Sequence, residues 1–325
     1  MRAVRIHQLT GPKAVRIDDI EAPPAPDANQ VKFDVKAAGI NFPEVLLTYG
    51  KYQFKPDPPF VPGGEAAGVV TAVGSEVTSI KVGDRVAATM LNGAFAEQVV
   101  VPELACVKVP EKVSFETAGV TLLAYGTTMH ALKDRAQLKA GETLLVLGAG
   151  GGVGMSAIQL GKAMGAKVIA AAAGEQKLKF CAELGADMVV DYDKEDLKER
   201  VKALTNGDGA NVIVDAVGGR YSEPALRAIA WEGRHLVIGF AAGEIPKIPL
   251  NLALLKGCQI VGVYWGFFAL KNPERNRANC AEVLQWVAEG RIRPHVHAVM
   301  PFAKAVEALE LMEQRKVFGK LALVP

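Results

Sequence analysis

The sequence predicts an α/β protein in which a β-rich part of roughly 120 residues precedes a doubly wound parallel sheet. Three observations support this prediction. The first hundred residues contain short apolar runs separated by Gly and Pro, a pattern typical of strands with irregular connections. From Thr143 onward, short apolar runs alternate with helical segments, which indicates a parallel sheet covered on both faces. A cluster of glycines directly follows the first of these runs.

In the β-rich part, strands are expected where apolar runs lie between Gly and Pro. These runs are residues 31–37, 65–73, 82–89 and 95–101. Ser114 is a candidate N-cap for a helix that begins at the next residue, and residues 119–133 are expected to be helical as well.

In the second part, strands and helices are expected in turn. The expected strands are 143–147, 167–172, 188–190, 212–215, 235–238 and 259–263, and the expected helices are 152–164, 176–184, 194–205 and 222–230. The tail, residues 274–325, is too short to form a third domain. We expect its two helices and its strands at 296–300 and 320–324 to pack back onto the first part.

The charge balance excludes several classes of protein. The chain has 37 Lys and Arg residues and 35 Asp and Glu residues, a net charge of +2. This balance gives no indication of binding to nucleic acid or to an anionic membrane. The N-terminus lacks the apolar stretch of a signal peptide and no apolar run could span a bilayer, so a cytoplasmic protein is expected. The four cysteines lack the spacing of a disulfide framework or a metal site: Cys106, Cys181, Cys258 and Cys280.

The glycine cluster has the context of a dinucleotide-binding loop. Gly-Ala-Gly-Gly-Gly-Val-Gly, residues 148–154, lies between an apolar strand and an expected helix. Glycines permit a tight turn and close approach to a pyrophosphate, and a helix N-terminus supplies free N–H groups. A simple strand-to-helix turn is the alternative, but a second strand about twenty residues further on favours the dinucleotide. The expected contacts are Gly151, Gly152, Val153 and Gly154.

The end of the second strand favours NADPH over NADH. An NAD site has a carboxylate there to bind the ribose 2′-hydroxyl, whereas this strand ends in alanines followed by Gly174. Lys177 lies just beyond, and Tyr192 follows the third strand, so both can donate to a 2′-phosphate. Glu175 is the counter-evidence, although it stands past the strand and can point to solvent.

Two motifs in the β-rich part carry a resemblance to the medium-chain dehydrogenases. They are Val-Lys-Ala-Ala-Gly-Ile-Asn at 35–41 and Pro-Gly-Gly-Glu-Ala-Ala-Gly at 62–68. In the zinc alcohol dehydrogenases of that superfamily, a cysteine and a histidine ligand occupy the places that Asn41 and Gly64 have here. The four-cysteine lobe for structural zinc is absent too. Without a thiolate or imidazole at those places we expect no metal.

The zinc-free branch that the chain resembles is the quinone oxidoreductase (zeta-crystallin-like) family. Further matching segments are Gly-Lys-Tyr at 50–52, Val-Gly-Asp-Arg-Val at 82–86, Ala-Tyr-Gly-Thr at 124–127 and Phe-Gly-Lys at 318–320. The resemblance implies a GroES-like catalytic domain, residues 1–123 and 268–325, and a Rossmann cofactor domain, residues 124–267.

The resemblance also implies roles for individual residues. Asn41, Tyr52 and Thr127 are the candidate catalytic residues, each able to donate a hydrogen bond to an acceptor oxygen. Each also has a structural alternative, because Asn41 and Thr127 can cap a turn or helix and Tyr52 can belong to the core. The implied cofactor contacts beyond the glycine loop are Ala173, Gly174, Lys177, Tyr192, Gly239, Phe240, Ala241, Tyr264, Trp265 and Arg315.

At two positions the chain has a residue that differs from the one often found in the family. The family often has Ser where Gly174 stands, and it often has a tyrosine where Leu46 stands, with Tyr49 three residues later here.

The expected function is an NADPH-dependent hydride transfer to a small molecule, a quinone or an enone, because a quinone needs little acid–base help. A 2-enoyl thioester reductase and a non-catalytic dinucleotide-binding protein are the alternatives, and the sequence does not decide the physiological substrate. The apolar strand at 259–263 is expected at the edge of the sheet, where it would pair with a second copy in a homodimer.

Overall fold

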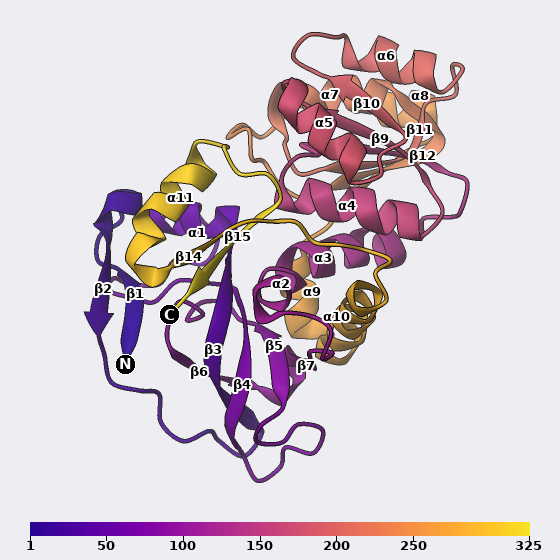
Figure 1. Ribbon diagram of the computed structural model, residues 1–325. Helices are drawn as coiled ribbons and strands as arrows, with labels where there is room; N and C mark the ends of the chain where they lie inside the picture. Colours follow the sequence, from indigo (N-terminus) through magenta and orange to yellow (C-terminus); the bar gives the residue numbers. More distant parts are fainter. The chain divides into compact units, whose positions relative to one another are not determined.

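A computed structural model describes the whole chain, residues 1–325, and its contacts divide it into two compact units (Figure 1). The first unit comprises Met1–Leu123 with Asn272–Pro325, and the second comprises Ala124–Lys271. The second boundary lies after Lys271 rather than after residue 267, because helix α9 (Trp265–Lys271) stays with the second unit. The ring of Phe268 stacks on His130 there, with ring centroids 3.7 Å apart.

The first unit is built on one mostly antiparallel sheet of seven strands. Six of them follow the order β14 (Val296–Pro301), β15 (Lys320–Val324), β3 (Gln30–Ile40), β4 (Glu65–Val73), β5 (Arg85–Thr89) and β7 (Cys106–Lys108), and β6 (Gln98–Pro102) also pairs with β3. A separate pair is formed by β1 (Arg2–Ile6) and β2 (Val15–Asp19). The helices are α1 (Phe42–Thr48), α2 (Phe115–Gly119), α10 (Pro273–Ala288) and α11 (Ala305–Glu313).

The last strand of the chain joins this sheet beside its longest strand. β15 runs antiparallel to β3, with Leu321 opposite Ile40 and Leu323 opposite Ala38, and parallel to β14 on its other side. All four residues from Lys320 to Leu323 are buried. The tail therefore returns to the first unit as its apolar strand predicts, and it brings the start of β15 next to the end of β3.

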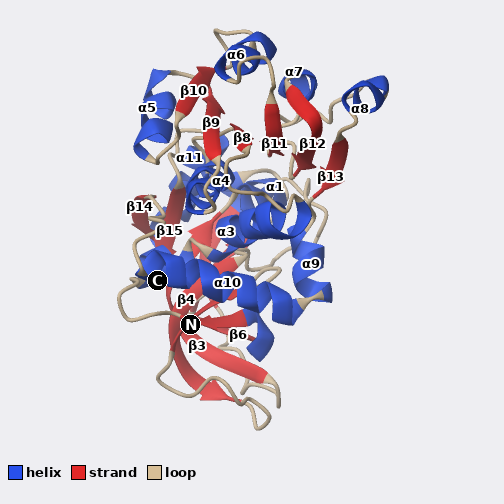
Figure 2. Cartoon of the chain, turned by 90° about the vertical axis from the view of Figure 1, so that its right-hand side faces the viewer, coloured by secondary structure: helices blue, strands red, loops and turns tan.

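The second unit is a six-stranded parallel sheet, as the alternation of strands and helices predicts (Figure 2). Its order is β10 (Met188–Asp191), β9 (Lys167–Ala172), β8 (Thr143–Leu147), β11 (Ala210–Asp215), β12 (Ile229–Val237) and β13 (Gln259–Gly262). The other helices of this unit are α4 (Gly152–Ala163), α5 (Glu175–Glu183), α6 (Leu197–Leu204), α7 (Ser222–Arg227) and α8 (Asn251–Lys256), and α3 (Leu122–Met129) begins in the last two residues of the first unit's main segment and continues into this one. None of the helices combines the length and the apolar composition that a bilayer crossing needs.

Strands β5 and β6 begin three residues later than expected, helices α8 and α9 were not expected, and two elements differ more strongly. Residues 119–133 are not one helix, because α2 ends at Gly119 and α3 passes into a π-helical turn, His130–Arg135. Strand β12 begins at Ile229 rather than at 235, and helix 222–230 is correspondingly shorter. A register shift in the pairing of β11 with β12 and the positive φ of Glu232, 57°, interrupt the apolar pattern and hide the start of β12 in the sequence.

Candidate functional site

Parallel strand topology brings most of the predicted cofactor residues to one edge of the second unit's sheet. The glycine loop follows β8, residues 173–177 follow β9, and Tyr192 follows β10. Residues 239–241 follow β12, and Tyr264 and Trp265 follow β13. All six strands are parallel, so these segments share the carboxyl edge, where dinucleotides bind in open α/β sheets. Arg315 lies in the first unit, in the turn after α11.

The glycine loop leaves no room for a side chain at two of its glycines, Gly148 and Gly154. A Cβ on Gly154 would lie 2.3 Å from the carbonyl oxygen of Gly148, which itself has a φ of 65°. Helix α4 begins at Gly152, and its N-cap, Gly151, provides no side-chain hydrogen bond to the first turn. The N–H groups of that turn and the helix dipole thus fit a bound pyrophosphate.

Lys177 lies directly against this loop. A Cβ on Gly150 would be 3.2 Å from the Cγ and 3.3 Å from both the Cβ and the Cδ of Lys177, so the lysine stem covers the loop. Strand β9 ends at Ala172 without a carboxylate, and Gly174, the N-cap of α5, has open space around its Cα. The residues at this corner fit an adenosine 2′-phosphate.

Tyr192 is part of an aromatic and charged group at the end of β10. Its ring lies 4.3 Å from that of Tyr221, measured between centroids. The carboxylate of Asp193 accepts hydrogen bonds from the hydroxyl of Tyr221 at 2.7 Å and from Arg220 at 2.8 Å. The local sequence pattern did not indicate Arg220 and Tyr221. They follow β11, and the fold brings them to Asp193, which follows β10.

In the first unit, Asn41 is the N-cap of helix α1. The carboxylate of Glu44, in the third helical position, accepts a hydrogen bond from the backbone N–H of Asn41 at 2.7 Å. This is one half of the arrangement that capping-box spacing predicts. Asn41 therefore stands at the N-cap position of α1.

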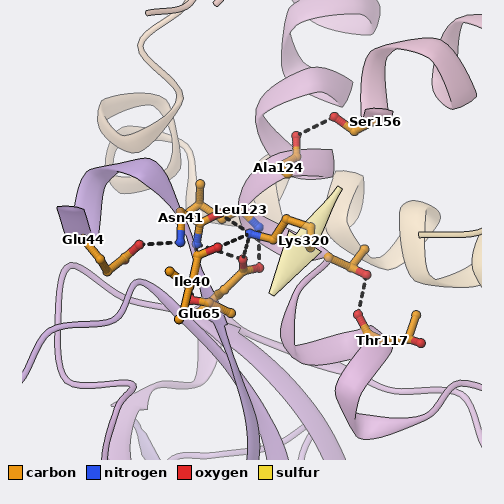
Figure 3. Close-up of polar contacts among 11 residues, drawn as sticks. Ile40, Asn41, Glu44, Glu65, Thr117, Leu123, Ala124, Ser156 and Lys320 are labelled. Atoms are coloured by element: carbon orange, nitrogen blue, oxygen red, sulfur yellow. Dashed lines mark hydrogen bonds and ion pairs between the residues drawn. The ribbon is translucent and has the colours of Figure 1, made fainter. Parts of the chain in front are cut away.

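The side chain of Asn41 meets a buried ion pair (Figure 3). The ammonium of Lys320 lies 2.9 Å from Oε1 of Glu65, and the two side chains are 2% and 1% exposed. Lys320 also donates to Oδ1 of Asn41 and, at 3.1 Å, to the carbonyl oxygen of Ile40. The second carboxylate oxygen of Glu65 accepts from the backbone N–H of Leu123 at 2.9 Å.

The partners of Asn41 fix the orientation of its amide. An ammonium can only donate and a carboxylate can only accept, so Oδ1 must face Lys320 and Nδ2 must face Glu65. Nδ2 lies 3.0 Å from Oε1 of Glu65 and 3.4 Å from the carbonyl oxygen of Gly39. Both amide hydrogens thus have acceptors within the first unit, and a hydrogen bond from Asn41 to a substrate would require one of them to be released.

Gly39 makes this cluster possible. A Cβ at this position would lie 2.4 Å from Oε1 of Glu65 and 2.7 Å from the carbonyl oxygen of Gly119. The glycine of the Ala-Gly-Ile-Asn segment is therefore required for the close approach of the Glu65 carboxylate to β3.

Glu44 is a further buried carboxyl next to this ion pair. Burial raises its pKa from the ordinary 4.5 to about 7, although the positive charge of Lys320 and the hydrogen bond from Asn41 lower it. The negative charge of Glu65 raises it further. Near neutral pH the cluster thus exchanges one proton, and its net charge changes with it.

The other two candidate catalytic residues lie apart from this cluster. Tyr52 follows α1 and is half-buried, packed against the core of the first unit. Thr127 lies in the middle of α3 in the second unit and is buried, so it does not cap that helix. Its neighbour Thr128 has its hydroxyl 2.6 Å from that of Ser156 in α4.

The residues of the first unit do not fit a catalytic zinc ion. Asn41 and Gly64 supply neither thiolate nor imidazole, and a Cβ on Gly64 would already lie 3.0 Å from Leu123. No group of three or more His, Cys, Asp or Glu side chains is arranged to hold a metal ion. A positively charged ammonium lies against Asn41 and Glu65 instead, and it would repel a cation.

Comparisons with known proteins agree with this architecture. Residues 27–111 match the family described as "Alcohol dehydrogenase GroES-like domain", and residues 152–289 match "Zinc-binding dehydrogenase". The "Quinone oxidoreductase-like protein 2 homolog" of Nematostella vectensis is 41% identical over 325 residues, which cover 99% of this chain and 88% of that protein. The chain belongs to the quinone oxidoreductase family of medium-chain dehydrogenases and reductases.

Other members of the quinone oxidoreductase family are similar over their whole length. The "Quinone oxidoreductase" of Pseudomonas aeruginosa is 33% identical over 317 residues, 97% of each chain. The crystal structure of Escherichia coli quinone oxidoreductase complexed with NADPH has a TM-score of 0.92 and 30% identity, covering both chains completely. The GroES-like and Rossmann-type domains predicted from the sequence are thereby confirmed.

Sequence reasoning missed the partners of Asn41. Glu65 and Lys320 belong to quoted family motifs, yet neither had an assigned role. Glu44 stands three residues after Asn41, a spacing at which an N-cap and its reciprocal carboxylate can be recognised. Lys320 gives no such signal, because a lysine before an apolar strand usually lies in solvent.

Glu44 predicts that the stability of this quinone oxidoreductase family member decreases as the pH rises. The folded pKa, about 7, lies above the unfolded value of 4.5, so the stabilising contribution is complete below pH 4.5 and is lost as the pH rises through 7. The loss is on the order of 3 kcal/mol. Glu44→Gln, which carries no titrating proton, should show a smaller fall in unfolding temperature between pH 5 and 8.

The matched control is Glu76→Gln, since Glu76 is exposed in the same unit. Its unfolding temperature should follow that of the unsubstituted protein across the range. Parallel curves for Glu44→Gln and the unsubstituted protein would show that Glu44 stays ionised in the fold.

Proposed function

We propose that this member of the quinone oxidoreductase family is an NADPH-dependent reductase that transfers hydride to a quinone or an enone without zinc. One observation carries the proposal: the loops expected to bind the cofactor follow the carboxyl ends of the parallel strands, whereas Asn41, at one zinc-ligand place, is bonded to Lys320 and Glu65. A reductase built in this way needs an acceptor that is reactive without a Lewis acid, and quinones and enones meet that requirement.

The cofactor part of the proposal is supported by the glycine loop and by Lys177. The stem of Lys177 covers the loop at Gly150, and β9 ends without the carboxylate of an NAD site. The similar Escherichia coli enzyme was crystallised with NADPH. When bound, NADPH supplies the hydride, and the residues of this chain hold and orient it.

On the substrate side, the chain's own contribution is hydrogen-bond donation to the acceptor oxygen. Tyr52 and Thr127 are proposed as donors to the acceptor oxygen. Asn41 is proposed as the third, with the condition that it releases Glu65 or Gly39 when substrate is bound. An enoyl thioester substrate would need a basic path for its long anionic tail, and only Lys51 and Lys55 flank Tyr52.

The experiment that tests the function is a steady-state comparison of a quinone, an enone and an enoyl thioester with NADPH. Quinone turnover is expected to have the highest kcat/KM. Preference for the thioester would favour the alternative reductase, and NADPH binding without turnover of any acceptor would indicate a non-catalytic dinucleotide-binding protein.

In the same assay, Tyr52→Phe should lower kcat more than it changes KM, because a donor to developing negative charge acts mainly in the transition state. In other enzymes the loss of such a donor lowers kcat by on the order of a hundredfold. We expect a smaller loss of kcat for an intrinsically reactive quinone than for an enone. Tyr49→Phe is the control, since the hydroxyl of Tyr49 is bonded to Glu313 at 2.6 Å. Equal kcat values for Tyr52→Phe and Tyr49→Phe on both acceptors would remove Tyr52 from the chemistry.

Lys177→Ala should weaken NADPH binding and leave NADH binding nearly unchanged. A charge-assisted contact to the 2′-phosphate is worth about 1.5–3 kcal/mol, or roughly ten- to a hundredfold in Kd. Lys179→Ala, an exposed lysine of the same helix, is the matched control. Titration of cofactor fluorescence measures both constants, and an equal loss for both cofactors would show that Lys177 does not contact the phosphate.

We further propose that two copies pair through β13, the edge strand of the parallel sheet. Ile260 of β13 is 44% exposed, and apolar side chains of α8 and α9 on either side of the strand in sequence are exposed as well: Leu254, Leu255, Phe267 and Leu270. An exposed apolar sheet edge is usually covered by pairing. Light scattering at micromolar concentration should give twice the 34.5 kDa of the chain, and Ile260→Lys should give the monomer mass. A monomer mass for the unsubstituted protein would contradict the pairing.

A further inference from the structure

Lys320 is a buried cation with three oxygen partners. Its side chain is 2% exposed, and its ammonium contacts the carboxylate of Glu65, the amide oxygen of Asn41 and the carbonyl oxygen of Ile40. Removing an ammonium from water is costly unless each of its hydrogens finds a partner, and here all three do. The three oxygen atoms come from β3, the turn after it and β4, which the sheet brings together around one point.

This arrangement resembles a cation site more than an ordinary ion pair. Asn41 Oδ1, Glu65 Oε1 and Ile40 O present their lone pairs to the same position (Figure 3). Without a positive charge there, the Glu65 carboxylate would be buried uncompensated, and Oδ1 of Asn41 would lose its donor. Asn41 occupies one of the places where zinc relatives carry ligands, Ile40 flanks that place, and Glu65 flanks the other.

We propose that Lys320 is a tethered cation that fills a buried site of three oxygen atoms and serves as the positioning residue for Asn41. Its charge fixes Oδ1 of Asn41, which directs Nδ2 toward Glu65 and sets the start of helix α1. The link to turnover rests on the proposed reductase function. The existence of the cation site does not, because it concerns contacts within the first unit alone.

The test is chemical rescue of Lys320→Ala. This variant lacks three methylene groups and the ammonium, which is the size of propylammonium. Both the unfolding temperature and kcat should fall, kcat by roughly ten- to a hundredfold, the value of a charge-assisted hydrogen bond. Propylammonium chloride should restore both in a saturable way when it is present during refolding or added later, whereas propan-1-ol and sodium chloride should not.

Two further variants keep the test decisive. Lys320→Met preserves most of the side-chain volume and removes the charge, so it should fold but retain the low kcat, with KM for NADPH little changed. Lys32→Ala is the control for unspecific amine effects, since Lys32 is a part-buried lysine of the same unit whose ammonium donates only to the carbonyl oxygen of Pro23, at 2.8 Å. Its properties should not respond to propylammonium.

The proposal is overturned if propan-1-ol restores Lys320→Ala as well as propylammonium does, if neither has an effect, or if Lys320→Met has the kcat of the unsubstituted protein. If the unsubstituted protein itself reduces no quinone or enone, the reductase function fails instead. The unfolding temperatures of the three variants, with and without the amine, then still decide whether Lys320 fills a cation site.

Discussion

The buried contact between the Lys320 ammonium and the Glu65 carboxylate ties together the segments that form the candidate site of the first unit. Glu65 begins β4, Lys320 begins β15, and both bind Asn41 at the end of β3. A buried ion pair is weak evidence for stability, because desolvation offsets most of the attraction. The role of this ion pair is to orient Asn41, since its two charged groups permit only one orientation of the Asn41 amide.

The same contact explains several local features of the sequence. Gly39 has no side chain because the Glu65 carboxylate occupies the space that a Cβ would need. The apolar strand β15 has a buried lysine at its first position because that position lies beside the end of β3. Glu44 keeps its proton to a higher pH because burial outweighs the nearby positive charge.

The fold was largely predictable, and the site only in part. Strands β8, β9 and β15 have the expected bounds, because continuous apolar runs bounded by polar residues and glycines leave little choice of register. The cofactor edge was predictable for a related reason, since parallel strands place every following loop on one side. The start of β12 was missed because a bulge interrupts its apolar pattern, and helices α8 and α9 were not anticipated. The Lys320 contact was not predictable from local pattern, as 255 positions separate Lys320 from Glu65.

Crystals of the protein purified without chelators would test most directly whether the Lys320 ammonium, and not a metal ion, fills the oxygen site of Ile40, Asn41 and Glu65. Diffraction data collected on both sides of the zinc absorption edge distinguish a bound zinc ion from a light atom. If Lys320 fills the site, the electron density will show its ammonium among Ile40, Asn41 and Glu65, with no anomalous peak there. An anomalous zinc peak bound by Glu65, with the Lys320 side chain displaced, would contradict this structure of the site and the zinc-free function that depends on it.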